Sequence, residues 1–283
     1  PPAPAPTPTF TYVDFDLSQD RVFAGQVASA STTERYTSDV APFYTIESQD
    51  ASLERNRGAL ELAYAASRSL VIRFAGETVT FAPADVQSSS GEGIVWRRAR
   101  DTSRRGDAAT FGRLQNHRYV YVAVQDIDED VRQPNTAAAF RTTTRYLLIG
   151  ERTRDGDVPT SGMSSYEAFL GTTTVGRNRG GGLTLSGGGT LSVDHATGTF
   201  NARLNVVQGS IPTGTEPERA TLVLEGTVTT SGVTGTITSP DSGYTGQFTG
   251  DLFGPRAIET GMVLTLSRPD GTRAAGRLFG RRR

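Results

Sequence analysis

The chain has 283 residues, which is enough for one or two domains with a buried core. Its 29 basic residues are all Arg and nearly balance its 30 acidic residues, so composition gives no support for nucleic-acid binding. The absence of Cys excludes disulfides and Cys-ligated metals, and no apolar stretch approaches the ~20 residues of a membrane-spanning helix.

The first nine residues, PPAPAPTPT, have the composition of an extended, semi-rigid tether. The chain begins with Pro1 rather than Met, and we expect that a signal peptide and a lipid-bearing Cys precede residues 1–9. The alternative is that the chain starts at a cloning boundary. The first codons of the gene distinguish the two, because a surface tether requires a signal peptide.

Residues 10–156 predict a mixed-β domain with long surface loops. Leu60, Leu62 and Tyr64 alternate with less apolar residues, as in a half-buried strand. The segment SLVIRFAGETVTFAP predicts a hairpin that turns at residues 75–77, and RYVYVAV and RYLLIG predict two further apolar strands.

Three segments of this half are not expected to form strands. The polar, Arg-rich residues 97–118 are interpreted as a loop, and the only helix candidate is short, near residues 137–140. The acidic run DIDED at residues 126–130 lacks the spaced Gly and terminal Glu of a calcium loop, so a solvated loop is expected there.

The segment IVWRRARDTSRRGDAATFGR contains the only Trp of the chain and six Arg. Trp and Arg are favoured at the hot spots of protein recognition, which makes this segment a candidate ligand-binding surface. The alternative is a flexible polar loop without a function. The candidate residues are Trp96, Arg97, Arg98, Arg104 and Arg105.

His117 and Tyr119 complete the candidate ligand-binding set. His117 is a hypothetical axial ligand of haem iron, with nearby Arg side chains pairing the haem propionates. The alternative is an exposed loop histidine. Because the only other histidine is His195, which precedes a turn and is expected to pack or lie exposed, a multi-His zinc site is excluded and no metal site is predicted.

Residues 157–283 differ in composition from the rest of the chain. Residues 1–158 contain 9 Gly and residues 159–283 contain 23. Many short strands with bending Gly predict a closed antiparallel barrel of about eight strands, which leaves no exposed edge. Hairpin turns are predicted within LSVDHATGTF and at residues 269–271.

The strand TFNARLNV predicts which side of the barrel is apolar. Phe200, Ala202, Leu204 and Val206 share one face, and Asn201, Arg203 and Asn205 share the other. A membrane barrel needs an apolar outer face and a polar interior. Since eight strands leave an interior that side chains can fill, we expect a soluble barrel with an apolar core.

Two motifs carry a family resemblance. YLLIGERTRDGDVPTSGMSSYEAFLG and GQFTGDLFGPRAIETGMVLTL resemble the entry and the signature of the barrel in transferrin-binding protein B-like surface lipoproteins. The matching positions are Gly150, Pro159, Gly162, Tyr166, Gly246, Phe248, Gly250, Phe253, Gly254, Pro255, Ala257, Glu259 and Gly261. Gly254 and Pro255 indicate a forced turn, and Glu259 is expected to cap exposed backbone donors at the barrel rim.

The resemblance implies an all-β chain in three parts: a tether at residues 1–9, an N-terminal mixed-β handle domain at 10–156, and the eight-stranded barrel at 157–283. The resemblance is specific over the barrel and less specific over residues 10–156. The full transferrin receptor has two such lobes, whereas this chain resembles the single-lobe relatives. Transferrin is therefore not the implied ligand.

The function implied is that of a surface lipoprotein of the Gram-negative outer membrane, lipid-anchored or secreted, that binds an extracellular protein or haem without catalysis. The expected task is haem or iron acquisition, with transfer to a TonB-dependent outer-membrane transporter. No cofactor is required, and haem enters only as a ligand. The alternative is an interaction protein for adhesion or host-factor recruitment without cargo. No catalytic residue is predicted, because no nucleophile elbow or phosphate loop is present.

Overall fold

The computed structural model describes residues 10–24, 28–40, 43–54, 60–74, 76–99, 106–114, 116–130, 138–175, 184–209 and 217–283. Apart from three single-turn 3-10 helices, the regular structure of these residues is β-strand, which confirms the predicted all-β class. Within the same ranges, no helix has the length and apolar character needed to cross a membrane.

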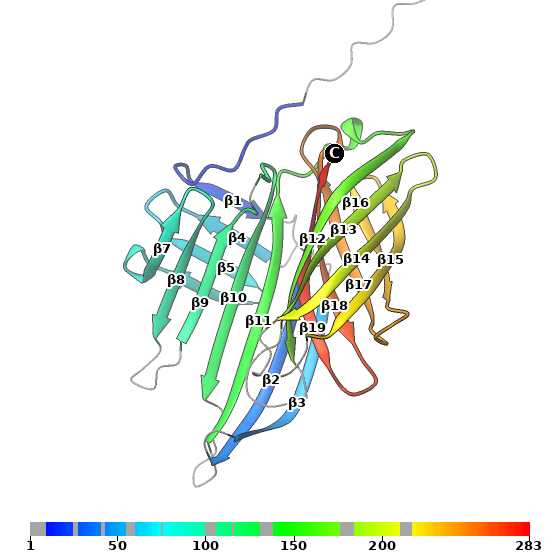
Figure 1. The fold of residues 1–283 in the computed structure, drawn as a ribbon. Helices are drawn as coiled ribbons and strands as arrows, with labels where there is room; N and C mark the ends of the chain where they lie inside the picture. The colour runs from blue at the N-terminus through cyan, green and yellow to red at the C-terminus, as the bar shows by residue number, and fades with distance from the viewer. Residues whose placement is uncertain are drawn as a thin grey trace, which may run out of the picture.

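Two sheets precede the barrel and are together called the handle (Figure 1). The smaller sheet has the order β1-β4-β5-β6, and the larger has the order β3-β2-β11-β10-β9-β8-β7. Their strands are β1 (Arg21–Ala24), β2 (Ala28–Val40), β3 (Phe43–Glu54), β4 (Leu60–Tyr64), β5 (Leu70–Phe74), β6 (Glu77–Phe81), β7 (Val86–Ser90), β8 (Gly93–Ala99), β9 (Gly106–Gly112), β10 (Val120–Asp130) and β11 (Ala138–Gly150).

Eight antiparallel strands in chain order form a closed barrel, as predicted. They are β12 (Met163–Val175), β13 (Thr184–Asp194), β14 (Thr199–Gly209), β15 (Arg219–Thr229), β16 (Gly232–Thr238), β17 (Thr245–Phe253), β18 (Glu259–Ser267) and β19 (Arg273–Arg282). Along β14, residues alternate between exposed and buried, with Phe200, Leu204 and Val206 in the barrel core. The apolar interior that TFNARLNV predicts is therefore confirmed.

The predicted hairpins are confirmed in register. Phe74 pairs with Glu77 in the handle, Asp194 pairs with Thr199, and Ser267 pairs with Arg273. The turn at residues 269–271 contains Gly271, whose φ is 93°. Only glycine adopts such a backbone angle without strain, so the Pro-Asp-Gly sequence determines this connection locally.

Three expectations for the handle are wrong. Of residues 97–118, expected as a loop, residues 97–99 end β8 and 106–112 form β9; residues 113, 114 and 116–118 are not in strands, and 100–105 and 115 lie outside the described residues. Residues 126–130 form the end of β10. Residues 138–140 are not helical but begin β11, where they pair with β2; residue 137 lies outside the described residues. Pairing to long neighbouring strands decides these segments, because β-structure depends more on cross-strand partners than on local preference.

The larger handle sheet lies between the smaller sheet and the barrel. Along β10, Tyr121 and Ala123 belong to the core shared with the smaller sheet, whereas Val120 and Val122 belong to the core shared with the barrel. This alternation follows from the period of two in a strand. A sheet that is apolar on both faces explains why RYVYVAV reads as an uninterrupted apolar run.

Candidate ligand-binding surfaces

The Trp-Arg segment does not form one exposed patch. Trp96 is fully buried, and its indole Nε1 donates to the Arg68 carbonyl oxygen at 2.8 Å. Arg98 lies on the same face of β8, where it pairs with the buried Asp107 at 2.8 Å and stacks over the Phe81 ring at 5.5 Å. Both side chains therefore stabilise the handle core.

Arg97 occupies the opposite face of β8 and is exposed. Val122 and Val124 of β10 lie on this same face, and there the barrel covers it. Arg97 is therefore available to a ligand, in contrast to its two neighbours in sequence. Arg104 and Arg105 lie outside the described residues.

His117 and Tyr119 lie at the contact between handle and barrel, which we call the seam. His117 is 3% exposed, and its ring centroid is 5.8 Å from that of Phe279 on β19. Tyr119 is also buried and makes an edge-to-face contact with Tyr12 at 6.0 Å. The structure thus separates these two residues from Trp96 and Arg98, which lie in the handle core.

A buried carboxylate links the two units. Glu259, which begins β18 of the barrel, is 1% exposed and accepts three backbone N–H groups of the handle. Its oxygens lie 2.7 Å from the Arg118 nitrogen, 2.9 Å from that of Tyr119 and 3.0 Å from that of Val120. Glu259 caps backbone donors as predicted, but these donors lie in the seam, at residues 118–120 where β10 of the handle begins, rather than at the barrel rim.

Two glycines of the signature motif permit this close contact. A Cβ at Gly254, whose φ is 71°, would lie 2.4 Å from the Tyr119 ring. A Cβ at Gly261 would lie 2.6 Å from a methyl of Val120 and 2.7 Å from one of Leu148. Both glycines are therefore required where the barrel wall meets the handle, which gives the motif a physical reason that the sequence did not show.

The segment that leads from handle to barrel is pinned at the same end. The Tyr12 hydroxyl donates to Asp157 at 2.8 Å, and the Arg256 backbone N–H donates to the same carboxylate oxygen at 2.9 Å. Burial, with the added effect of Asp157, raises the pKa of Tyr12 to about 12. The Thr153 hydroxyl adds a buried hydrogen bond of 2.8 Å to the Gly254 carbonyl oxygen. Together these bonds fix the barrel against the handle.

The opposite end of the molecule carries the paired ends of long strands. Val40 pairs with Phe43, and Ala99 pairs with Gly106. In Figure 1 these strand ends point the same way as the turns that join β16 to β17 and β18 to β19, away from the C-terminus. Handle and barrel therefore present strand ends toward one side, and Glu259 holds them at the other.

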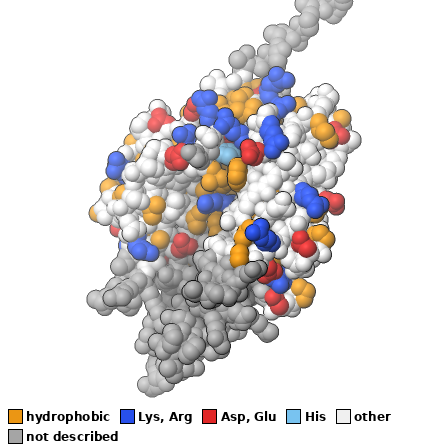
Figure 2. All heavy atoms as spheres, in the orientation of Figure 1, with side chains coloured by type: hydrophobic (Ala, Val, Ile, Leu, Met, Phe, Trp, Pro, Cys, Tyr) orange, Lys and Arg blue, Asp and Glu red, His pale blue; other side chains and the backbone are white. Residues whose placement is uncertain are grey.

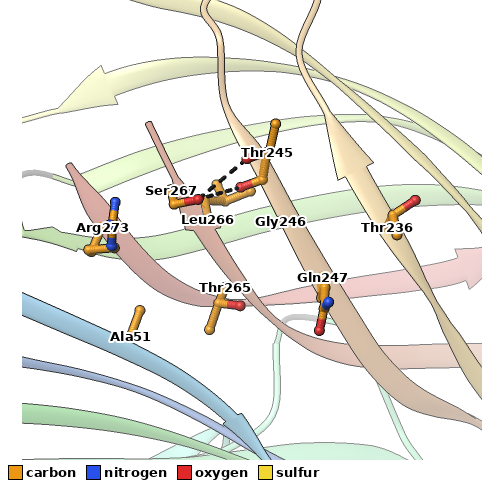
Figure 3. Close-up of a pocket in the computed structure, with 9 residues that line it drawn as sticks. All are labelled: Ala51, Thr236, Thr245, Gly246, Gln247, Thr265, Leu266, Ser267 and Arg273. Carbon is orange, nitrogen blue, oxygen red and sulfur yellow. Dashed lines mark hydrogen bonds between the residues drawn. The ribbon is translucent and has the colours of Figure 1, made fainter. Parts of the chain in front are cut away.

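Two hollows lie among the described residues, one beside the seam and one within the handle. One, of about 450 Å³, is a crevice between the outer barrel wall and β3, lined mainly by hydroxyl and amide side chains (Figure 3). Figure 3 shows Ala51 of β3 facing Thr265, with Arg273 and Gln247 on either side. The other, of about 820 Å³, opens between the two handle sheets and is called the handle groove.

Charge is mixed over the described part of the face that Figure 2 shows. Figure 2 shows acidic and basic side chains interspersed over the described part of one face, with basic side chains gathered at the end from which the N-terminal segment leaves. Among the described residues, no group of three or more His, Cys, Asp or Glu is placed to hold a metal ion.

No known family model matches the chain. No curated protein matches it in sequence either. In fold it is similar to a transferrin-binding protein B variant from Haemophilus parasuis, with 14% identity and a TM-score of 0.45 over 88% of this chain and 59% of that one. The chain thus spans less than two thirds of that structure.

Two further similar structures are transferrin-binding protein B isotype 1 from serogroup B Neisseria meningitidis and the N-lobe of lactoferrin-binding protein B from Moraxella bovis. The first shares 13% identity at a TM-score of 0.44, over 90% of this chain and 43% of that one. The second shares 11% identity at a TM-score of 0.36, and the match covers 68% of this chain and 80% of that one. They belong to the group that the C-terminal motifs resemble, but scores and identities this low assign neither a ligand nor a family to this chain.

Proposed function

We propose that this chain is a non-catalytic binding protein of the Gram-negative cell surface, held to the outer membrane by a lipid anchor that precedes the tether. Its task is to capture haem or an iron-bearing extracellular protein and to deliver it to a TonB-dependent transporter. The observation that supports this proposal is the clamp of Glu259 on residues 118–120, which makes handle and barrel one presenting surface.

The clamp matters because binding costs free energy for every group that must be ordered. Two units already fixed against each other lose little further freedom when a ligand contacts both of them. The barrel interior holds its own apolar side chains, among them Phe200, Phe248 and Leu264, so ligand contacts fall on outer faces and strand ends. A filled barrel beside a clamped sheet suits presentation of a surface rather than enclosure of a substrate.

Binding of the intact chain to haem, haemoglobin and iron-loaded lactoferrin tests the proposal by biolayer interferometry. We expect saturable binding to one of these probes and about tenfold weaker binding by Arg97→Ala, whose side chain is exposed. Glu225→Ala, an exposed substitution on the barrel wall, serves as the control. Absence of binding to all three probes would contradict the iron-acquisition proposal.

The haem form of the proposal has a spectroscopic test. A Soret band that forms on adding haem and is lost in His117→Ala supports ligation by His117. Because His117 is buried against Phe279, ligation requires the seam to open, and amide exchange at residues 118–120 would then rise on haem binding. A haem titration without a spectral change or a shift in melting temperature removes haem as the ligand.

The alternative, an adhesion or recruitment protein without cargo, is favoured by the mixed charge and hydroxyl-rich outer faces. It predicts binding to host cells or matrix proteins but not to the iron-bearing probes. The same interferometry with immobilised matrix protein separates the two candidates.

A further inference from the structure

The handle groove arises from the register of the larger sheet. On the face turned toward the smaller sheet, one cross-strand row reads Ile94, Phe111, Ala123 and Leu147, all buried. Two residues further along each strand, the corresponding row reads Trp96, Ala109, Gln125, Arg145, Ser31 and Ser52. The apolar core thus gives way to a polar floor on β11, β2 and β3.

The floor of the groove consists of hydroxyl groups paired across strands. Ser31 and Ser52 oxygens are 2.8 Å apart, and Thr33 and Thr143 oxygens are 3.1 Å apart. A hydroxyl has one donor and two acceptor positions, so each hydroxyl pair retains one donor and three acceptor positions after its mutual hydrogen bond. The floor therefore offers hydrogen-bond acceptors and, in smaller number, donors.

The walls carry both charges and an apolar strip. Arg145 pairs with Glu77 of the β6 edge at 3.1 Å and stacks over the Phe74 ring at 5.1 Å. Asp50, Glu54 and Arg141 are exposed at the rim. The lining contains three acidic side chains and two arginines, so it does not favour a strongly charged ligand of either sign. Phe74, Val79 and Ile127 provide the apolar contact.

One buried donor at the boundary of the groove has no acceptor. Gln125 is 0% exposed, and its Oε1 lies 3.5 Å from the Arg145 guanidinium, but its Nε2 has no hydrogen-bond partner. Gln125 lies on the same face of β10 as Ile127, which lines the groove. Because Gln125 is fully buried and is not among the residues that line the groove, it extends the polar row beneath the groove and is not itself a ligand contact.

We propose that the handle groove binds a neutral saccharide. Sugar hydroxyls supply acceptors for the Arg145 donors and donors for Asp50 and Glu54, and the C–H face of a sugar ring packs on an apolar strip such as that of Phe74. A volume of about 820 Å³ lies within the ~300–1,000 Å³ typical of small-ligand sites. This inference does not depend on the iron-acquisition proposal.

An array of immobilised neutral gluco-, galacto- and mannosaccharides, with sialylated and sulfated counterparts, tests the inference on the intact chain. We expect binding to neutral members and competition by the same free saccharide, measured again by calorimetric titration. Binding confined to sialylated or sulfated members, or no binding on the array, overturns the proposal.

Rim variants locate the site. Asp50→Ala and Arg141→Ala change exposed side chains, so the fold should persist, and we expect each to weaken the saccharide titration at least fivefold. Glu225→Ala and Arg203→Ala remove one acid and one arginine from the exposed barrel wall and are the matched controls. If the rim variants misfold, protection of the amides of residues 141–147 on adding saccharide gives an independent readout. If the rim variants and the barrel-wall controls lose saccharide affinity equally, or if exchange at the amides of residues 141–147 does not change, the site is not in the groove.

Discussion

At the scale of single residues, buried polar groups decide how the two units meet. The backbone N–H groups of residues 118–120 enter the seam, where water is excluded and each needs an acceptor. Glu259 provides two oxygens for all three. Hydrogen bonds to an ionised acceptor are about twice as strong as neutral ones, so one side chain can hold the start of β10 against β18.

The first prediction concerns this clamp. Glu259→Ala leaves three buried or half-buried N–H groups without an acceptor, and we expect a loss of about 3 kcal/mol or more in the free energy of unfolding. Urea unfolding measures the loss, and amide exchange at residues 118–120 should accelerate. Glu225→Ala, an exposed change on the barrel wall, should leave both unchanged. Slow exchange of those amides in Glu259→Ala would show that another acceptor holds them.

A second residue-scale prediction concerns pH. His195 is half-buried, with its Nε2 2.8 Å from the Ser164 hydroxyl; burial, and then the charge of Arg282, lowers its pKa, which Asp194 partly opposes. The folded chain therefore takes up this proton less readily than the unfolded chain, whose histidine titrates near ~6.5. The contribution of His195 to the free energy of unfolding is fully present above that pH. It is lost as the pH falls through the pKa of His195 in the folded chain.

Replacement of His195 by Phe removes this contribution. We expect the unfolding free energy of His195→Phe to vary less than that of the parent chain as pH falls below ~6.5. An NMR titration of His195 supplies the direct value. A measured pKa at or above the ordinary histidine value would contradict the account.

At the scale of elements, β13 shows how glycine sets the distance between strands. A Cβ at Gly189 would lie 1.9 Å from the Arg203 carbonyl oxygen of β14, and one at Gly187 would lie 2.0 Å from that of Asn205. The two strands approach so closely that no side chain fits at these inward positions. The Gly-rich character of the C-terminal half therefore reflects barrel curvature.

Alanine at two glycines tests this explanation. Gly189→Ala forces the β13 and β14 backbones apart, and we expect a destabilisation of about 1–3 kcal/mol. At Gly171 on β12 a Cβ would meet nothing within 4 Å, so Gly171→Ala should be neutral or stabilising by up to about 1 kcal/mol. Thermal unfolding compares the two variants, and equal effects would refute the argument from strand spacing.

At the scale of the whole molecule, the seam is a second core outside the barrel. Phe253, Val263 and Phe279 of the barrel wall pack against Tyr119 and Leu148 of the handle. The Arg277 guanidinium lies over the Tyr146 ring at 5.8 Å, and burial lowers the pKa of Arg277. A barrel that is apolar on one outer side as well as inside needs the handle to cover that side.

Two phenylalanines paired across neighbouring strands test the role of the seam. Phe279 of β19 is 1% exposed, whereas its partner Phe169 of β12 is 51% exposed. Phe279→Ala should cost about 3–5 kcal/mol and increase proteolysis of residues 150–162, which connect handle and barrel. Phe169→Ala should change neither property by much. If the two variants behave alike, the seam does not couple the units.

The sequence by itself determined the barrel. Alternation along residues 199–206, the turn at 269–271 and the glycine content each constrain local backbone, so closure into eight strands with an apolar interior was predictable. The signature motif also indicated a role for Gly254 and Glu259. Local patterns of this kind are visible in one chain because they act over a few residues.

Only the tertiary structure decided how the handle strands are layered and where the candidate sites lie. Trp96 and Asp107 of the Trp-Arg segment are buried because residues 93–99 and 106–112 pair as β8 and β9 rather than forming a loop. His117 lies in a seam between segments more than a hundred residues apart, and the handle groove depends on the register of strands β2, β3, β10 and β11. Contacts between distant segments leave no periodic signal in the sequence, since each partner strand contributes only half of the environment.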